Sequence, residues 1–128
     1  MQISLKRKIK APVDVVFDAL SNEVVLSEYA GKCAFERKVG GIVMFFDEWV
    51  HGEVLKYVKN KELSYTWKPT DWPETANASV VTMTFLERGV ATVIELTHEN
   101  FPNDKEAENH KNGWEEYIFG PLEKYLIG

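Results

Sequence analysis

The end of the chain carries an amphipathic pattern that requires an apolar partner. In the segment Asn103–Leu126, large apolar residues recur at intervals of three and four from Trp114 onward, whereas charged residues occupy the opposite side. The apolar stripe consists of Trp114, Tyr117, Ile118, Leu122, Tyr125 and Leu126. This spacing predicts one long helix with an aromatic face. No other segment predicts a helix long enough to pair with it, so the helix must cover a sheet.

The middle of the chain supplies that sheet. Between Lys32 and Asn100, β-rich runs alternate with turn residues such as Gly40-Gly41 and Arg88-Gly89. The runs predict strands near 32–38, 42–48, 50–58, 62–68, 78–87 and 90–98. In the last two runs apolar and polar residues alternate, which predicts one dry face and one wet face.

The beginning of the chain adds a strand and two short helices. Ile3–Lys10 alternates apolar and charged residues, and the apolar spacing after Pro12 predicts helices near 13–20 and 23–29. The resulting fold class is α+β, with a curved antiparallel sheet of about seven strands around a long C-terminal helix. We expect residues 1–128 to form a single domain. Gly120-Pro121 interrupts the helical stripe and predicts a bend there that sets the width of the space beneath the helix.

Charge and cysteine content narrow the range of partners. The net charge is −5, whereas nucleic-acid binding requires a basic face. The basic residues Lys6, Arg7, Lys8 and Lys10 are interpreted as the solvent face of an edge strand. Cys33 is the single cysteine, so it can form neither an intrachain disulfide nor a cysteine-based metal site. With no signal-like or membrane-spanning segment, we expect a cytoplasmic protein that is a monomer or a weak homodimer and binds neither nucleic acid nor membrane.

Several motifs, in this order and spacing, match a known family. They are Ala11-Pro12, Val16 to Leu20, Gly40-Gly41, Gly52 to Leu55, Leu63 to Trp67, Val81 to Phe85, Thr92, Leu96 to His98, Gly113-Trp114 and Leu122 to Leu126. The chain resembles the helix-grip superfamily called SRPBCC, the START and birch-pollen-allergen-like fold. Within it, the chain looks most like the family related to the activator of heat-shock protein 90 ATPase. Eukaryotic members of that family carry a further N-terminal domain, which we expect to be missing here.

The resemblance implies a cavity between the sheet and the C-terminal helix for a small hydrophobic ligand, without a cofactor. From the predicted strand registers, the residues expected to line it are Phe17, Val43, Phe45, Val54, Tyr65, Trp67, Val81, Met83, Phe85, Ile94, Leu96, His98, Trp114, Tyr117 and Ile118. The same residues could instead form a solid core. Buried tryptophan and tyrosine favour a cavity, because their polar tips need partners that a ligand or water can supply.

Other functions stay open. A chaperone-associated interaction module is one alternative, and an aromatase, cyclase or hydrolase that uses His98, Tyr65 or Glu95 is another. His98 is placed at the pocket rim or at a strand end bonded to backbone, whereas His51 and His110 are expected on polar surfaces. The acidic and histidine residues at 47–53 alternate along a strand, which disfavours a metal site.

The loop Thr70–Thr75 carries a further tryptophan, Trp72. Such a loop could form a lid or a partner contact at the cavity mouth, or Trp72 could pack back on the strand ends.

Overall fold

The computed structural model describes residues 1–128 and contains one seven-stranded antiparallel sheet. The strand order is β1-β7-β6-β5-β4-β3-β2. The elements are β1 (Gln2–Ile9), α1 (Val13–Ala19), α2 (Glu23–Tyr29), β2 (Ala34–Phe35), β3 (Ile42–Phe45), β4 (Val50–Val58), β5 (Glu62–Pro69), β6 (Ser79–Arg88), β7 (Ala91–Glu99), α3 (Asp104–Gly113), η1 (Trp114–Phe119) and α4 (Gly120–Ile127).

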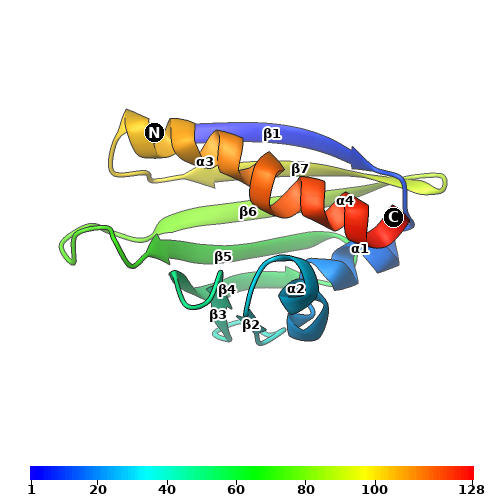
Figure 1. Cartoon of the computed structure of the whole chain (residues 1–128), viewed down its shortest axis with the longest axis horizontal. Coiled ribbons are helices and arrows are strands. Elements are labelled where there is room, and N and C mark those ends of the chain that lie inside the picture. Colours follow the sequence, from blue (N-terminus) through cyan, green and yellow to red (C-terminus); the bar gives the residue numbers. More distant parts are fainter.

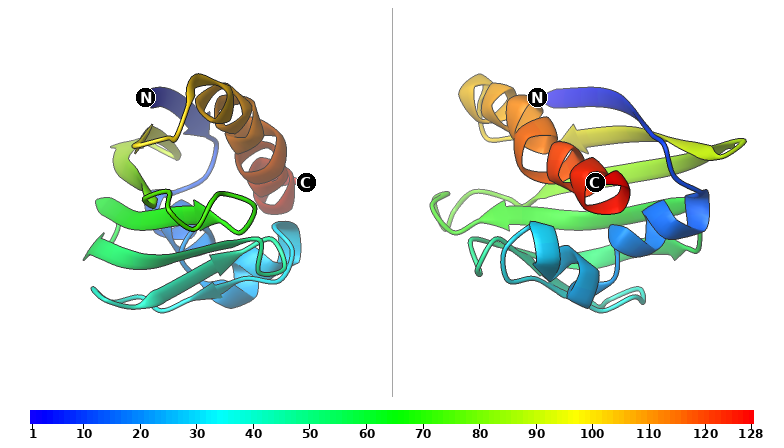
Figure 2. Two further views of the ribbon diagram at one scale, coloured as in Figure 1. Left: turned by 90° about the vertical axis from the view of Figure 1, so that its left-hand side faces the viewer. Right: turned by 45° about the vertical axis from the view of Figure 1, so that its right-hand side comes forward.

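The sheet curves around the C-terminal helix, which crosses it diagonally (Figures 1 and 2). The helices α1 and α2 lie on the same side of the sheet, next to the end of the chain. The α+β class, the seven strands and the covering helix are therefore confirmed. No helix is both long enough and apolar enough to span a membrane.

Strand registers place one continuous row of apolar side chains beneath the helix. Leu5 pairs with Leu96, Leu96 with Met83, and Met83 with Leu63. The last three of these are at most 1% exposed. The neighbouring row on the other face consists of Ser4, Thr97, Thr82 and Ser64. This alternation confirms one dry and one wet face, and it directs the apolar row toward the helix.

The long helix changes its winding halfway along. The side chain of Asn103 accepts a hydrogen bond from the backbone N–H of Glu106 and caps the start of α3. Residues 114–119 are wound as a π-helix, and the N–H of Gly120 bonds to the carbonyl of Glu115. Where a bend was predicted at Gly120-Pro121, the structure has a wider turn just before the proline. Pro121 has no N–H to donate, and a re-registered turn accommodates it.

The strands near the first turns are shorter than expected. β2 contains only two residues, and β3 ends at Phe45 instead of reaching residue 48. The reason is local backbone conformation, because Phe46, Asp47 and Glu48 all have positive φ values, of 55°, 56° and 74°. These values are incompatible with a strand.

The interpretation of Arg7 as a solvent-facing residue is wrong. Arg7 shares its face of β1 with Leu5 and Ile9, and its guanidinium reaches the helix. It donates to both carboxylate oxygens of Glu115 at 2.8 and 3.1 Å, and to Glu123 at 3.1 Å. These carboxylates raise the pKa of the Arg7 side chain above its usual range. Arg7 thus joins the edge strand to the helix.

Candidate functional site

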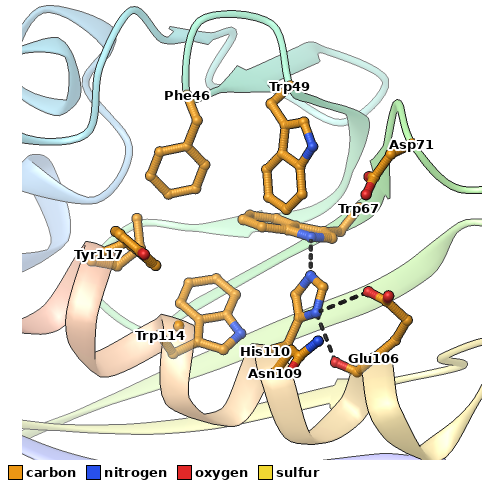
Figure 3. A pocket seen from close by; sticks show the side chains of 11 residues that line it. Phe46, Trp49, Trp67, Asp71, Glu106, Asn109, His110, Trp114 and Tyr117 are labelled. Atoms are coloured by element: carbon orange, nitrogen blue, oxygen red, sulfur yellow. Dashed lines mark hydrogen bonds and ion pairs between the residues drawn. The ribbon is translucent and has the colours of Figure 1, made fainter.

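A cavity of about 250 Å³ lies between α3, η1, the turn after β3 and the end of β5 (Figure 3). It is lined by Phe46, Trp49, Trp67, Asp71, Glu106, Asn109, His110, Gly113, Trp114, Tyr117 and Ile118. Its floor is buried, since Trp67 and Trp114 are each 3% exposed. Its mouth is open, since Tyr117 is 58% and Trp49 40% exposed.

The turn after β3 has a strained backbone, and its side chains form one wall of the cavity. The three positive-φ residues 46–48 place Phe46 and Trp49 over the end of β5 (Figure 3). Left-handed conformations cost about 1–2 kcal/mol for each residue with a Cβ. Backbone bonds between Asp47 and Lys32 and between Thr70 and Trp49 hold the turn in place. Such strain is commonly retained at functional sites.

The other walls come from the helix and from β5. Trp67 and Trp114 lie with ring centroids 5.1 Å apart, and Phe46 stands nearly perpendicular to Trp67 and to Tyr117 at 6.3 Å from each. Figure 3 shows Phe46 and Trp49 on one side of the hollow and Trp114 and Tyr117 on the other. The cavity surface is therefore mainly aromatic.

Two histidines accept the indole protons of the buried tryptophans. Nε1 of Trp67 donates to Nε2 of His110 at 3.1 Å, and Nε1 of Trp114 donates to Nδ1 of His98 at 3.1 Å. An indole N–H can only donate, so each of these ring nitrogens must be an unprotonated acceptor. The protons of the two imidazoles therefore lie on Nδ1 of His110 and on Nε2 of His98.

The remaining ring nitrogens complete two directed chains of hydrogen bonds. Nδ1 of His110 donates to the carbonyl of Glu106 at 2.9 Å. Nε2 of His98 donates to the hydroxyl of Ser79 at 2.8 Å, and that hydroxyl donates to the carbonyl of Trp67 at 2.6 Å. We call the side chains of Trp67, Ser79, His98, His110 and Trp114 the indole–imidazole network.

Burial holds both histidines in their neutral forms. It lowers the pKa of His98 to about 2, and the neighbouring His110 contributes to the same shift. Burial also lowers the pKa of His110. All four ring nitrogens have protein partners, so neither histidine offers a free acid or base to the cavity.

Two carboxylates stand at the edge of the cavity, and the lining contains no lysine or arginine. Asp71 is exposed, whereas the side chain of Glu106 is 28% exposed. Oε1 of Glu106 accepts a hydrogen bond from Nε1 of Trp72 at 3.0 Å. Trp72 is 6% exposed and packs against Phe101 and His110. The loop tryptophan is therefore packed back on the fold.

Among the residues expected to line a cavity, Trp67, Trp114, Tyr117 and Ile118 do so. The others lie in the packed interior, each at most 5% exposed: Phe17, Val43, Phe45, Val54, Tyr65, Val81, Met83, Phe85, Ile94, Leu96 and His98. His98 was expected at the pocket rim or at a strand end bonded to backbone, but it is fully buried and bonds to the side chains of Ser79 and Trp114. His110 was expected on a polar surface, but it is only 8% exposed and faces the tryptophans. His51 is solvent-exposed, as expected.

The candidate catalytic residues do not meet. Glu95 lies on the outer face and pairs with Lys6 at 3.4 Å, whereas Tyr65 and His98 are buried. Burial raises the pKa of the Tyr65 hydroxyl above its usual value. No group of three or more histidine, cysteine, aspartate or glutamate side chains is arranged to hold a metal ion.

Seven lining residues were missed at the sequence level: Phe46, Trp49, Asp71, Glu106, Asn109, His110 and Gly113. A signal existed for part of this set. Glu106, His110, Gly113 and Tyr117 follow one another at helical spacing, so the apolar stripe of the helix continues toward its N-terminus through polar residues.

A family model described as "Activator of Hsp90 ATPase homolog 1-like protein" matches residues 10–127. An HSP90 activator from Plasmodium falciparum is 27% identical with a TM-score of 0.89, over 98% of this chain and 96% of that one. A protein from Mesorhizobium loti is also 27% identical, with a TM-score of 0.86 over the same shares.

A Micromonospora echinospora protein, CalU16, shares the fold at 21% identity, with a TM-score of 0.83 over 98% of this chain and 76% of that one. No curated protein matches the chain.

Proposed function

This chain belongs to the family of Activator of Hsp90 ATPase homolog 1-like proteins, and from that premise we propose that it binds a small hydrophobic molecule in the aromatic cavity. Binding is non-covalent and involves no chemical change. The site lies where the family resemblance implies one, between the sheet and the C-terminal helix. It uses only one end of that interface.

One observation supports this proposal most strongly. The aromatic walls of the cavity present apolar surface, because the polar N–H groups of their buried tryptophans are hydrogen-bonded inside the protein. The indole N–H groups of Trp67 and Trp114 bond to histidines inside the protein. The occupant therefore meets the carbon surfaces of the rings. At about 250 Å³, the space is slightly smaller than common ligand pockets of ~300–1,000 Å³. A ligand of one or two rings suits it.

The two histidines offer the cavity no free acid or base, because all their ring nitrogens are hydrogen-bonded within the protein, and this supports binding without catalysis. Both ring nitrogens of His110 are engaged, and the imidazole is held neutral. General acid–base catalysis needs a group within hydrogen-bond reach of the substrate that can gain or lose a proton. The lone buried Cys33 suits a reducing cytoplasm as the place of action.

Gly113 offers a direct test. Its backbone has φ −63°, which any residue adopts, and a Cβ there would meet only Cδ2 of Tyr117, at 3.7 Å. A Gly113→Leu side chain would occupy the cavity, while removing a helical glycine stabilises the helix by up to about 1 kcal/mol. The adjacent Asn112→Leu adds the same side chain at an exposed position outside the cavity lining.

The measurement combines native mass spectrometry of freshly purified protein with a thermal-shift screen of small aromatic compounds. We expect the wild type and Asn112→Leu to bind and Gly113→Leu to lose binding while remaining folded. Equal binding by all three proteins would exclude the cavity as the site. No binding by the wild type would contradict the proposal.

A second candidate function is association with a chaperone. It is favoured by the full-length similarity, at 27% identity, to the HSP90 activator from Plasmodium falciparum. If it holds, the purified chain will stimulate the ATPase activity of an HSP90, and Gly113→Leu will stimulate it equally, because a surface contact does not need the cavity. No stimulation at stoichiometric amounts of the chain would contradict this candidate.

A further inference from the structure

We propose that the ligand of the aromatic cavity carries a positive charge: it is a small organic ammonium, primary or quaternary, attached to an apolar body. This inference rests on the proposed function and specifies the chemical class of the ligand. It combines three observations, namely the charge of the lining, the arrangement of the rings and the fixed neutrality of the histidines.

The lining carries two carboxylates that the protein does not neutralise. Asp71 and Glu106 face the cavity together with no lysine or arginine (Figure 3). Neither forms an ion pair with a lysine or arginine elsewhere, although five other such pairs exist in the chain. The carboxylate of Glu106 accepts a hydrogen bond from the uncharged indole of Trp72, and the neutral imidazole of His110 lies 3.8 Å from the same oxygen. A cationic ligand would supply the missing positive charge.

The aromatic rings add attraction for the same charge. Phe46 stands at 76° to Trp67 and at 72° to Tyr117, so the rings form corners and not one flat stack. Trp49 and Trp114 stand beside them in the lining. A cation within about 6 Å of a ring centroid is attracted to the ring face, and tryptophan attracts it most strongly. A hollow of this size brings an ammonium group close to several rings at once.

His110 is the one lining residue that could otherwise provide a positive charge. Its Nε2 accepts the proton of Trp67, and its Nδ1 donates to a backbone carbonyl. Protonation of Nε2 would place its N–H opposite the indole N–H of Trp67, so two donors would face each other without an acceptor. The two carboxylates are therefore the only formal charges in the lining, and they repel fatty acids and other carboxylates.

Three probes with the same ring but different charge test whether the cavity prefers a cationic, a neutral or an anionic ligand. They are benzyltrimethylammonium, benzyl alcohol and benzoate. Binding is measured by isothermal titration calorimetry on the full chain at low salt. We expect benzyltrimethylammonium to bind about tenfold or more tightly than benzyl alcohol, since cation–π attraction and two carboxylates act together. Benzoate should not bind, and added salt should weaken only the cation.

Charge-neutral variants provide the matched control. In Asp71→Asn combined with Glu106→Gln, the amide oxygen of glutamine can still accept from Trp72, so the loop stays in place. This double variant should bind benzyltrimethylammonium about tenfold more weakly and benzyl alcohol as before. Glu53→Gln combined with Glu87→Gln removes the same net charge at exposed sites outside the cavity lining. It should bind all probes like the wild type.

The outcomes distinguish this inference from the proposed function. If benzyl alcohol binds as tightly as the cation, or if the Asp71/Glu106 double variant keeps full affinity for the cation, the ligand is not selected by charge. A hydrophobic site then remains. If none of the probes binds the wild type, both proposals fail. If Gly113→Leu binds the cation like the wild type, the cation occupies another surface and the inference is overturned.

Discussion

The two ends of the helix–sheet interface both use aromatic side chains, but only one of them is hollow. Beneath α4, at what we call the closed end, Phe17 packs on Phe85 at 5.0 Å and on Tyr57 at 5.4 Å, and Leu122 is 0% exposed. Beneath α3 and η1, at the pocket end, tryptophans and histidines surround the cavity of about 250 Å³.

The two ends differ in whether hydrogen bonds fix the orientation of the aromatic rings. The side chains at the closed end pack mainly through apolar surfaces without directional constraints, so they can close up against one another. At the pocket end, hydrogen bonds of 2.6–3.1 Å fix the orientation of each ring in the indole–imidazole network. Collapse into the hollow would break these bonds and leave buried polar groups unpaired. The network therefore holds the cavity open.

The largest contrast is expected between Phe17→Ala and Trp49→Ala. Phe17 is 2% exposed and tightly packed, so its truncation should lower the free energy of unfolding by about 3–5 kcal/mol. Trp49 is 40% exposed at the cavity mouth, and its truncation should cost about 1 kcal/mol or less. Urea denaturation measures both values. Similar costs would show that the pocket end is packed as firmly as the closed end.

The next largest effect should follow from His98→Leu. The leucine fills similar space, but it leaves the indole N–H of Trp114 without its acceptor. We expect a loss of about 2–3 kcal/mol in unfolding free energy.

Combining His98→Leu with Trp114→Phe removes both partners, so the double variant should lose less than the sum of the two single changes. If the loss in unfolding free energy of the double variant equals the sum of the two single losses, this hydrogen bond does not stabilise the fold.

The pH dependence of stability reports on the same network. In the unfolded chain a histidine has a pKa of about 6.5, whereas folding lowers that of His98 to about 2 and lowers that of His110 as well. Below pH 6.5 the unfolded state takes up protons that the folded state does not, so stability falls as the pH falls.

Between pH 7 and pH 4.5, His98 alone should account for a loss of about 2–3 kcal/mol. Urea denaturation across this range measures the slope, which should be shallower in His98→Leu. If the pH dependence of the unfolding free energy is the same in His98→Leu as in the wild type, it arises from groups outside the network.

Much of the fold could be predicted because it depends on local patterns. The expected strand at 50–58 and the expected helix at 23–29 match β4 and α2 residue for residue. Alternation and helical spacing specify such elements directly. The expected strand at 42–48 failed at Phe46, because three successive residues with side chains adopt positive φ. Of the three, only Asp47 is of a type that favours this conformation.

The site was less predictable because it depends on partners far apart in the sequence. Trp67 and Trp114 were expected to face a cavity, and they do. The separate argument that their polar tips favour a cavity was wrong, since their N–H groups bond to His110 and His98 instead of a ligand or water. Pairing of residues 43 and 16 positions apart can be recognised only once the fold brings them together.

The smallest effect on stability is expected at Arg7, which lies between the two ends. It tests whether ion pairs from the edge strand help to position the helix. Its guanidinium joins β1 to Glu115 in η1 and to Glu123 in α4. Because these groups are partly exposed, Arg7→Met should cost about 0.5–1 kcal/mol in unfolding free energy, and the cost should shrink in high salt. Lys8→Met, on the outer face of the same strand, should cost less. If the indole–imidazole network alone keeps the cavity open, Arg7→Met will leave the affinity for benzyltrimethylammonium unchanged in calorimetric titration. A marked change in affinity would instead show that the edge strand sets the position of η1, and with it the width of the pocket end.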